Sequence, residues 1–194
     1  LPALAGCNPQ VHLQTGAPLQ GTVDRHAKQA EGIQQLATPC VVRLKMPERL
    51  AGQEDSLLTH ANMSHLYYYS VSPVFERAFQ DAVYKVFSPA DSGVLNAFTV
   101  EVSLRRSMLM IGSDSARYDV RGEATLRSDT GRIICSHDLN AMTNSGFDGR
   151  TTPPAVWDAA YKMAFDYLDE ISRDSRIYAA AEQSGGVLRI GRLA

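Results

Sequence analysis

The sequence of 194 residues predicts an α+β fold, a two-layer α/β sandwich in which a mainly antiparallel sheet packs two helices on one face. Two stretches carry apolar residues at helical spacing, and between them lie strands in which apolar and polar residues alternate. Strands that are apolar on one side need a covering layer on that side only, so we expect both helices on the same face.

Two strands and one helix are predicted before these alternating strands. Residues 41–46 (VVRLKM) form a short strand candidate that ends at Pro47, because proline cannot continue a central ladder. Residues 65–71 (HLYYYSV) form a second strand, rich in aromatic residues. Pro73 then opens a helix, and Pro89 ends it. Its apolar stripe consists of Phe75, Ala78, Phe79, Ala82, Val83 and Val86.

A three-stranded meander and a second helix follow. Residues 98–104, 117–126 and 132–139 are the predicted strands, and the turn at 128–131 (SDTG) joins the last two. Residues 157–172 have helical periodicity, with acidic and lysine side chains on the opposite face. The apolar positions of this helix are Val156, Ala160, Met163, Ala164, Tyr167, Leu168 and Ile171.

These elements define the expected organisation of the chain. Residues 40–173 form a single α/β domain, while residues 7–39 have few large apolar side chains and are expected to be a tether. After Arg173 the helical pattern ends, and residues 174–194 are expected to be a flexible tail.

Composition and the length of apolar runs argue against a nucleic-acid-binding protein and against a transmembrane helix. Lysine and arginine number 19 against 21 acidic residues, and no basic block occurs, so no nucleic-acid partner is expected. The sequence also has no apolar run of about 18 residues, the length that a transmembrane helix needs.

The residues Leu4-Ala5-Gly6-Cys7 resemble the lipobox of bacterial lipoproteins, in which a leucine and two small residues precede a lipidated cysteine. The resemblance implies that residues 1–6 end a signal peptide and that lipid on Cys7 anchors the protein to a membrane. In enteric bacteria an aspartate after the cysteine favours retention in the inner membrane. Asn8 therefore implies the periplasmic face of the outer membrane.

A second resemblance rests on the order of the elements over residues 41–172. The arrangement resembles that of small periplasmic lipoproteins that assist ABC-type transport or outer-membrane assembly. It consists of a lipobox, a tether, a strand, a helix, a long hairpin and a C-terminal helix. This resemblance implies a protein partner in the cell envelope.

Cys40 and Cys135 remain once Cys7 is assigned to lipid. In an oxidising compartment an even pair is expected to be bridged, and the enclosed loop would stabilise the fold by up to about 4–5 kcal/mol. Cysteine is also commonly buried for packing alone. The sequence leaves open whether Cys40 and Cys135 form a disulfide or are free buried thiols.

Motifs for known chemistry are missing from the sequence. It contains no G-x-S-x-G, H-E-x-x-H or P-loop sequence, so neither a catalytic residue nor a cofactor is predicted. Cys135 and His137 lie two residues apart on one strand face, a spacing that could contact a metal. A zinc site needs more ligands than this pair supplies, so no metal site is predicted.

Two apolar clusters are candidates for contact with a partner: Tyr67-Tyr68-Tyr69, and Met108 with Met110. Consecutive apolar residues on a strand point to both faces, so about half of them cannot reach the same core. Tyrosine is favoured at interfaces and methionine adapts to varied partners. Burial under another part of the chain is the alternative.

Together these features predict a lipid-anchored, non-enzymatic periplasmic module that binds or assists an envelope transport or assembly complex. The alternatives are a lipidated periplasmic hydrolase and a structural lipoprotein of the cell envelope. A hydrolase would require serine, histidine and acidic side chains that converge in a cleft.

Overall fold

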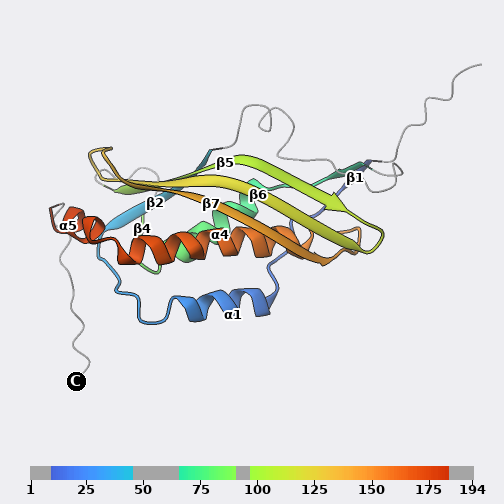
Figure 1. Cartoon of the computed structure of the whole chain (residues 1–194), viewed down its shortest axis with the longest axis horizontal. Helices are drawn as coiled ribbons and strands as arrows, with labels where there is room; N and C mark the ends of the chain where they lie inside the picture. Colours follow the sequence, from blue (N-terminus) through green and yellow to red (C-terminus); the bar gives the residue numbers. More distant parts are fainter. Residues whose placement is uncertain (1–9, 46–65, 91–96, 184–194) are drawn as a thin grey trace, which may run out of the picture.

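The computed structural model describes residues 10–45, 66–90 and 97–183 of the chain (Figure 1). The strands are β1 (Gln10–His12), β2 (Pro39–Lys45), β3 (Leu66–Tyr68), β4 (Ser88–Pro89), β5 (Phe98–Ile111), β6 (Ser115–Arg127) and β7 (Ile133–Gly146). The helices are α1 (Gln20–Gln29), α3 (Ser72–Val83), α4 (Pro154–Arg173) and α5 (Ser175–Gln183). None of the described helices has both the length and the hydropathy needed to cross a membrane.

The main sheet is open and has five strands in the order β4-β2-β5-β6-β7. The long strands β5, β6 and β7 form the predicted antiparallel meander. β2 runs parallel to β5, and β4 runs parallel to β2. Helices α3 and α4 pack side by side on one face of this sheet (Figure 1). The predicted α+β fold with a mainly antiparallel sheet and two helices on one face is confirmed.

A β-bulge in β5 keeps one face of the meander apolar over its whole length. Up to Leu104 the even-numbered residues are buried, and from Ser107 onward the odd-numbered residues are buried. The register with β6 shifts between Leu104 and Arg106, so Arg105 is the extra residue. Without this extra residue, Leu109 would point away from the helices.

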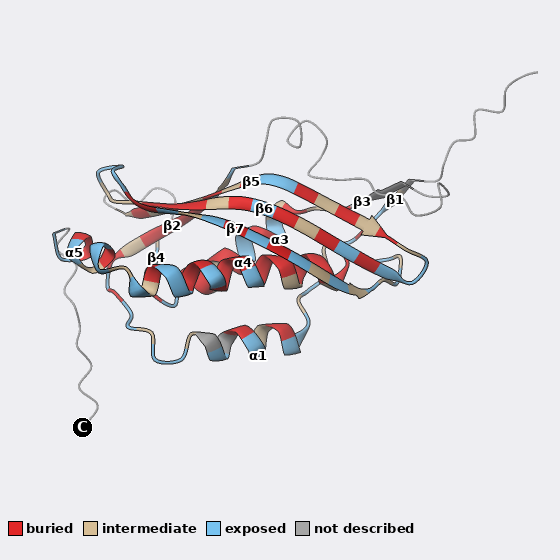
Figure 2. Ribbon diagram, viewed as in Figure 1, coloured by how far each residue is buried: buried red, intermediate tan, exposed pale blue. Residues whose placement is uncertain are grey.

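The predicted tether over residues 7–39 is wrong from Gln10 onward. Helix α1 packs against α4 on the side away from the sheet and forms a third layer (Figures 1 and 2). The His26 ring stacks on Tyr161 and Phe165, with ring centroids 6.0 and 5.4 Å apart. The Trp157 indole N–H donates to the carbonyl of Thr15 at 3.2 Å. The tether was expected because α1 itself carries few apolar residues, and aromatic residues of α4 supply its contacts.

Two further expectations need correction. The strand predicted at 65–71 does not join the main sheet: β3 pairs in parallel with β1 in a separate two-stranded sheet. The predicted tail begins with helix α5, whose residues Ile177 and Ala181 are buried, so the chain is folded through Gln183. Residues 184–194 lie outside the described residues.

Candidate functional site

The face of the main sheet opposite α3 and α4 is the candidate functional site, and we call it the open face. No helix among the described residues covers it, and its side chains alternate with the buried ones along the same strands (Figure 2). The cross-strand register aligns Met108, Asp119 and Met142 in one row, and Met110, Arg117 and Asn144 in the next. The open face therefore combines apolar and charged side chains.

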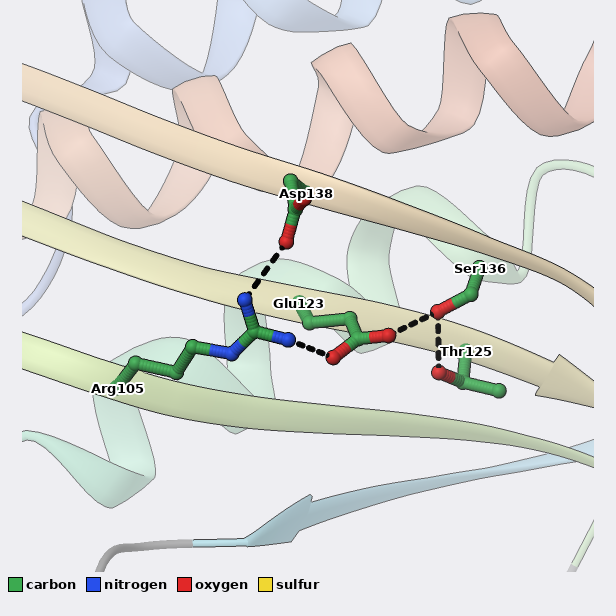
Figure 3. A network of polar contacts seen from close by, with 5 residues as sticks. All are labelled: Arg105, Glu123, Thr125, Ser136 and Asp138. Atoms are coloured by element: carbon green, nitrogen blue, oxygen red, sulfur yellow. Dashed lines mark hydrogen bonds and ion pairs between the residues drawn. The ribbon is translucent and has the colours of Figure 1, made fainter.

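A chain of polar contacts crosses the middle of the open face (Figure 3). Thr125 and Ser136 hydroxyls lie 2.7 Å apart, and the Ser136 hydroxyl donates to the Glu123 carboxylate. Arg105 joins the other oxygen of Glu123 to Asp138, with its guanidinium 2.9 Å from the Asp138 carboxylate. The extra residue of the bulge thus supplies the cation that connects the three long strands.

These contacts lower the pKa of Glu123 below its ordinary value of 4.5. The first cause is the hydrogen bond from Ser136, and the attraction of Arg105 adds to it. Glu123 is therefore ionised at neutral pH and fixes the position of the Arg105 guanidinium. The network is a structural element of the surface, because its polar groups satisfy one another.

Basic residues outnumber acidic residues on the open face by seven to four, although the whole chain has a net charge of −2. The seven basic residues are Arg43, Lys45, Arg105, Arg106, Arg117, Arg121 and Arg127. The four acidic residues are Glu101, Asp119, Glu123 and Asp138, and all four form ion pairs with basic residues of this face. The excess charge of the open face is therefore positive.

The structure places Met108 and Met110 on the open face, partly exposed, whereas Leu109 and Ile111 between and beside them are buried. Met142 of β7 joins them with 55% of its surface exposed, and the Arg117 guanidinium contacts its sulfur atom. Met142 is not among the partner-binding residues predicted from the sequence. The sequence pattern that could have identified Met142 is the alternation of β7, in which Leu139 and Ala141 are buried and Met142 points to the other side.

The three tyrosines do not share one role. Tyr69 is only 2% exposed, so the prediction that it contacts a partner is wrong and the alternative of burial holds. Burial raises the pKa of its hydroxyl well above the ordinary value. Tyr67 and Tyr68 lie in β3, and contact of their side chains with a partner stays a prediction.

The disulfide between Cys40 and Cys135 is absent: both are free, buried thiols. Cys40 lies in β2 and Cys135 in β7, which are three strand spacings apart in the sheet, or about 14 Å. A disulfide requires Cα atoms within about 7 Å. Burial raises the pKa of Cys40 to about 12, and burial is also the first cause that raises the pKa of Cys135. Cys7 lies outside the described residues.

No protein-family model matches this sequence, and no curated protein matches it. Similar solved structures include a lipoprotein from Caulobacter crescentus, with 11% identity, a TM-score of 0.32 and coverage of 84% of this chain and 99% of that chain. A minor lipoprotein from Acinetobacter baumannii has 13% identity, a TM-score of 0.33 and coverage of 77% and 94%. The PelC dodecamer from Paraburkholderia phytofirmans has 13% identity, a TM-score of 0.34 and coverage of 69% and 89%. At these TM-scores the likenesses carry no argument about this chain.

Proposed function

We propose that this chain is a lipid-anchored, non-enzymatic module of the bacterial envelope that binds a protein partner through its open face. The partner belongs to an envelope transport or assembly complex. Lipid on Cys7 holds the module at the periplasmic face of the outer membrane, and no cofactor takes part.

One observation carries the proposal: the five-stranded sheet has two chemically different faces, and only one of them is covered by described helices. The open face presents Met108, Met110 and Met142 among charged groups. Flexible, polarizable methionine side chains adapt to the shape of a partner, and surrounding charges select its orientation.

The charge of the open face restricts the chemistry of the partner. Its four carboxylates are already paired with basic residues, and basic residues are in excess. Complementary charge raises the rate of association and disfavours like-charged surfaces. The proposed partner therefore presents an acidic surface with an apolar centre.

Membrane fractionation tests the anchor. The wild-type chain should fractionate with the outer membrane, and Cys7→Ala should move it to the soluble fraction, because acyl chains would be its anchor. Cys40→Ala removes a different thiol and should leave the fractionation unchanged. Equal membrane association of the wild type and Cys7→Ala would contradict the anchor.

Copurification tests the binding surface. After mild detergent extraction, the wild type should retain a partner that the double variant Met108→Glu/Met110→Glu loses, because the new carboxylates oppose the charge and apolar character of the open face. Arg25→Glu, on the exposed surface of α1, is the control and should retain it. A partner held equally by all three proteins would place the interface elsewhere.

A further inference from the structure

Three side chains capable of binding a metal converge where β7 begins and α4 meets α5. They are Cys135, His137 and Asp174, and one donor atom from each lies within 4.8 Å of the others. Cys135 and His137 point to the helix-covered side of β7, because they are two residues apart on one strand. Asp174 follows the last residue of α4 and precedes α5.

The imidazole of His137 has one nitrogen directed to a carboxylate and one without a partner. Its Nδ1 lies 3.8 Å from Oε2 of Glu170 on α4. Its Nε2 is buried and has no hydrogen-bond partner among the described residues. A histidine that binds a metal commonly directs its other ring nitrogen to a carboxylate, which orients the ring. Buried polar atoms are normally satisfied, so the unpaired Nε2 requires an explanation.

A buried tyrosine hydroxyl lies beside this cluster. The Tyr167 ring meets the His137 ring edge-on, with centroids 5.9 Å apart. Its hydroxyl is buried and lies within hydrogen-bonding reach of the Cys135 thiol. An unpaired imidazole nitrogen and a buried hydroxyl therefore lie next to a thiol and a carboxylate in this part of the described core.

We propose that Cys135, His137 and Asp174 bind a divalent transition-metal ion of the zinc class. The donor set of one sulfur, one nitrogen and one oxygen matches the ligands that zinc prefers. Ligand atoms around a tetrahedral zinc ion are about 3.3–3.8 Å apart, so donors within 4.8 Å need to move by only about 1 Å. The Cys135 thiol releases its proton to solvent when its sulfur binds the metal, and a water molecule can take the fourth position.

The surroundings of Asp174 are compatible with this role. The main-chain N–H and the guanidinium of Arg176 donate to the Asp174 carboxylate at distances from 2.6 to 3.1 Å. These contacts are four hydrogen bonds, two to each carboxylate oxygen, and the Arg176 Nε–H is shared between both oxygens. A carboxylate offers about four lone-pair directions, so a metal would replace one of the two bonds from this shared N–H. The hydrogen bonds from Arg176 also hold the carboxylate in place at the corner between the two helices.

A surface cavity of about 400 Å³ has His137 as the one proposed ligand in its lining. Its charged lining consists of His137, Asp138, Lys162, Asp166, Asp169 and Glu170, so acidic groups outnumber the lysine. Cys135 is only 4% exposed, and the side chains of His137 and Asp174 are 23% and 12% exposed. The proposed site is thus enclosed but lies next to an acidic surface cavity.

Metal binding would fasten the corner between α4 and α5 to the edge strand β7. This inference is independent of the proposed partner binding, because it concerns the covered side of the sheet and a different set of residues.

Titration of the purified full chain with Co²⁺ tests the proposal, since a thiolate bound to Co²⁺ gives a charge-transfer absorption band. The wild type should bind one ion, show this band and lose it when Zn²⁺ displaces the Co²⁺. Cys135→Ser should abolish the band, and His137→Gln and Asp174→Asn should weaken binding strongly. Glu170→Gln should weaken Co²⁺ binding by about 10–100-fold, because Glu170 orients the His137 ring and does not bind the metal itself.

Cys40→Ser and Cys7→Ser are the matched controls and should keep the wild-type affinity. A wild type without the band, or a band that survives Cys135→Ser, would overturn the proposal. A second test uses the wild type alone and does not depend on whether the variants fold. Zn²⁺ should slow the alkylation of Cys135, and a chelator should restore the original rate. Alkylation of Cys135 at the same rate with and without Zn²⁺ would also overturn the proposal.

Discussion

The covered and open faces of the main sheet are built from alternate residues of the same strands, yet they differ in almost every property. On the covered face, Leu104, Leu109 and Tyr118 are fully buried against the helices. On the open face, Arg105 and Asp138 remain exposed although they form an ion pair. The covered face therefore provides stability, whereas the open face carries the side chains of the proposed partner contact.

Alanine substitutions at two consecutive residues of β5 should show the largest difference in stability between the two faces. Leu109→Ala removes a fully buried side chain and should lower the free energy of unfolding by about 2–5 kcal/mol. Met110→Ala, on the open face, should lower it by less than about 1 kcal/mol. Urea unfolding measures both values. Equal losses of unfolding free energy would mean that Leu109 and Met110 do not lie on different faces of the sheet.

Substitution of Gly122 tests the bulge itself. A Cβ atom at this position would lie 2.7 Å from the main-chain oxygen of Ser103, so Gly122→Ala should destabilise the fold by about 1–3 kcal/mol. Gly21→Ala in α1 is the control: its Cβ would meet no atom within 4 Å, and it should be neutral or stabilise by up to about 1 kcal/mol. Thermal unfolding of both variants checks the prediction, which fails if Gly122→Ala is as stable as the wild type.

The smallest expected effect concerns Glu123 on the open face. Its pKa is lower in the folded chain, so its ionised form contributes stability above its ordinary pKa of 4.5. That contribution is lost as the pH falls below 4.5 and through the folded-state pKa. Glu123→Gln should therefore be slightly less stable than the wild type at pH 7, and the difference should shrink in acid. Unfolding of both proteins measured from pH 7 into acid checks this prediction. A stability difference that grows in acid would mean that folding raises the pKa of Glu123 instead of lowering it.

The periodic parts of the fold could be predicted from the sequence. Helices α3 and α4 and the strands of the meander each repeat their apolar residues many times, and burial against a neighbour follows from that pattern. Helix α1 could not be predicted in this way, because its position depends on Trp157, Tyr161 and Phe165 of α4. These aromatic residues are four apart and form a second stripe, which is the signal that α4 is covered on two sides.

The candidate sites were predicted less completely, because they depend on residues brought together from distant segments. The pair Cys135 and His137 is visible in one strand, but Asp174 joins it only when the chain turns from α4 into α5. The count of cysteines left open whether Cys40 and Cys135 form a disulfide, and strand order decides it by placing them three strands apart. Neither strand order nor a helix corner follows from local periodicity.

Site-specific photo-crosslinking tests the central claim, that the open face binds a protein partner. A photoreactive amino acid at position 110 should give a protein adduct of discrete mass in intact cells, and the same residue at position 25, on the exposed surface of α1, should not. In isolated membranes the adduct should decrease at high salt, because salt screens attraction between exposed charges. An adduct of equal yield from position 25, or lipid adducts alone from position 110, would contradict the claim.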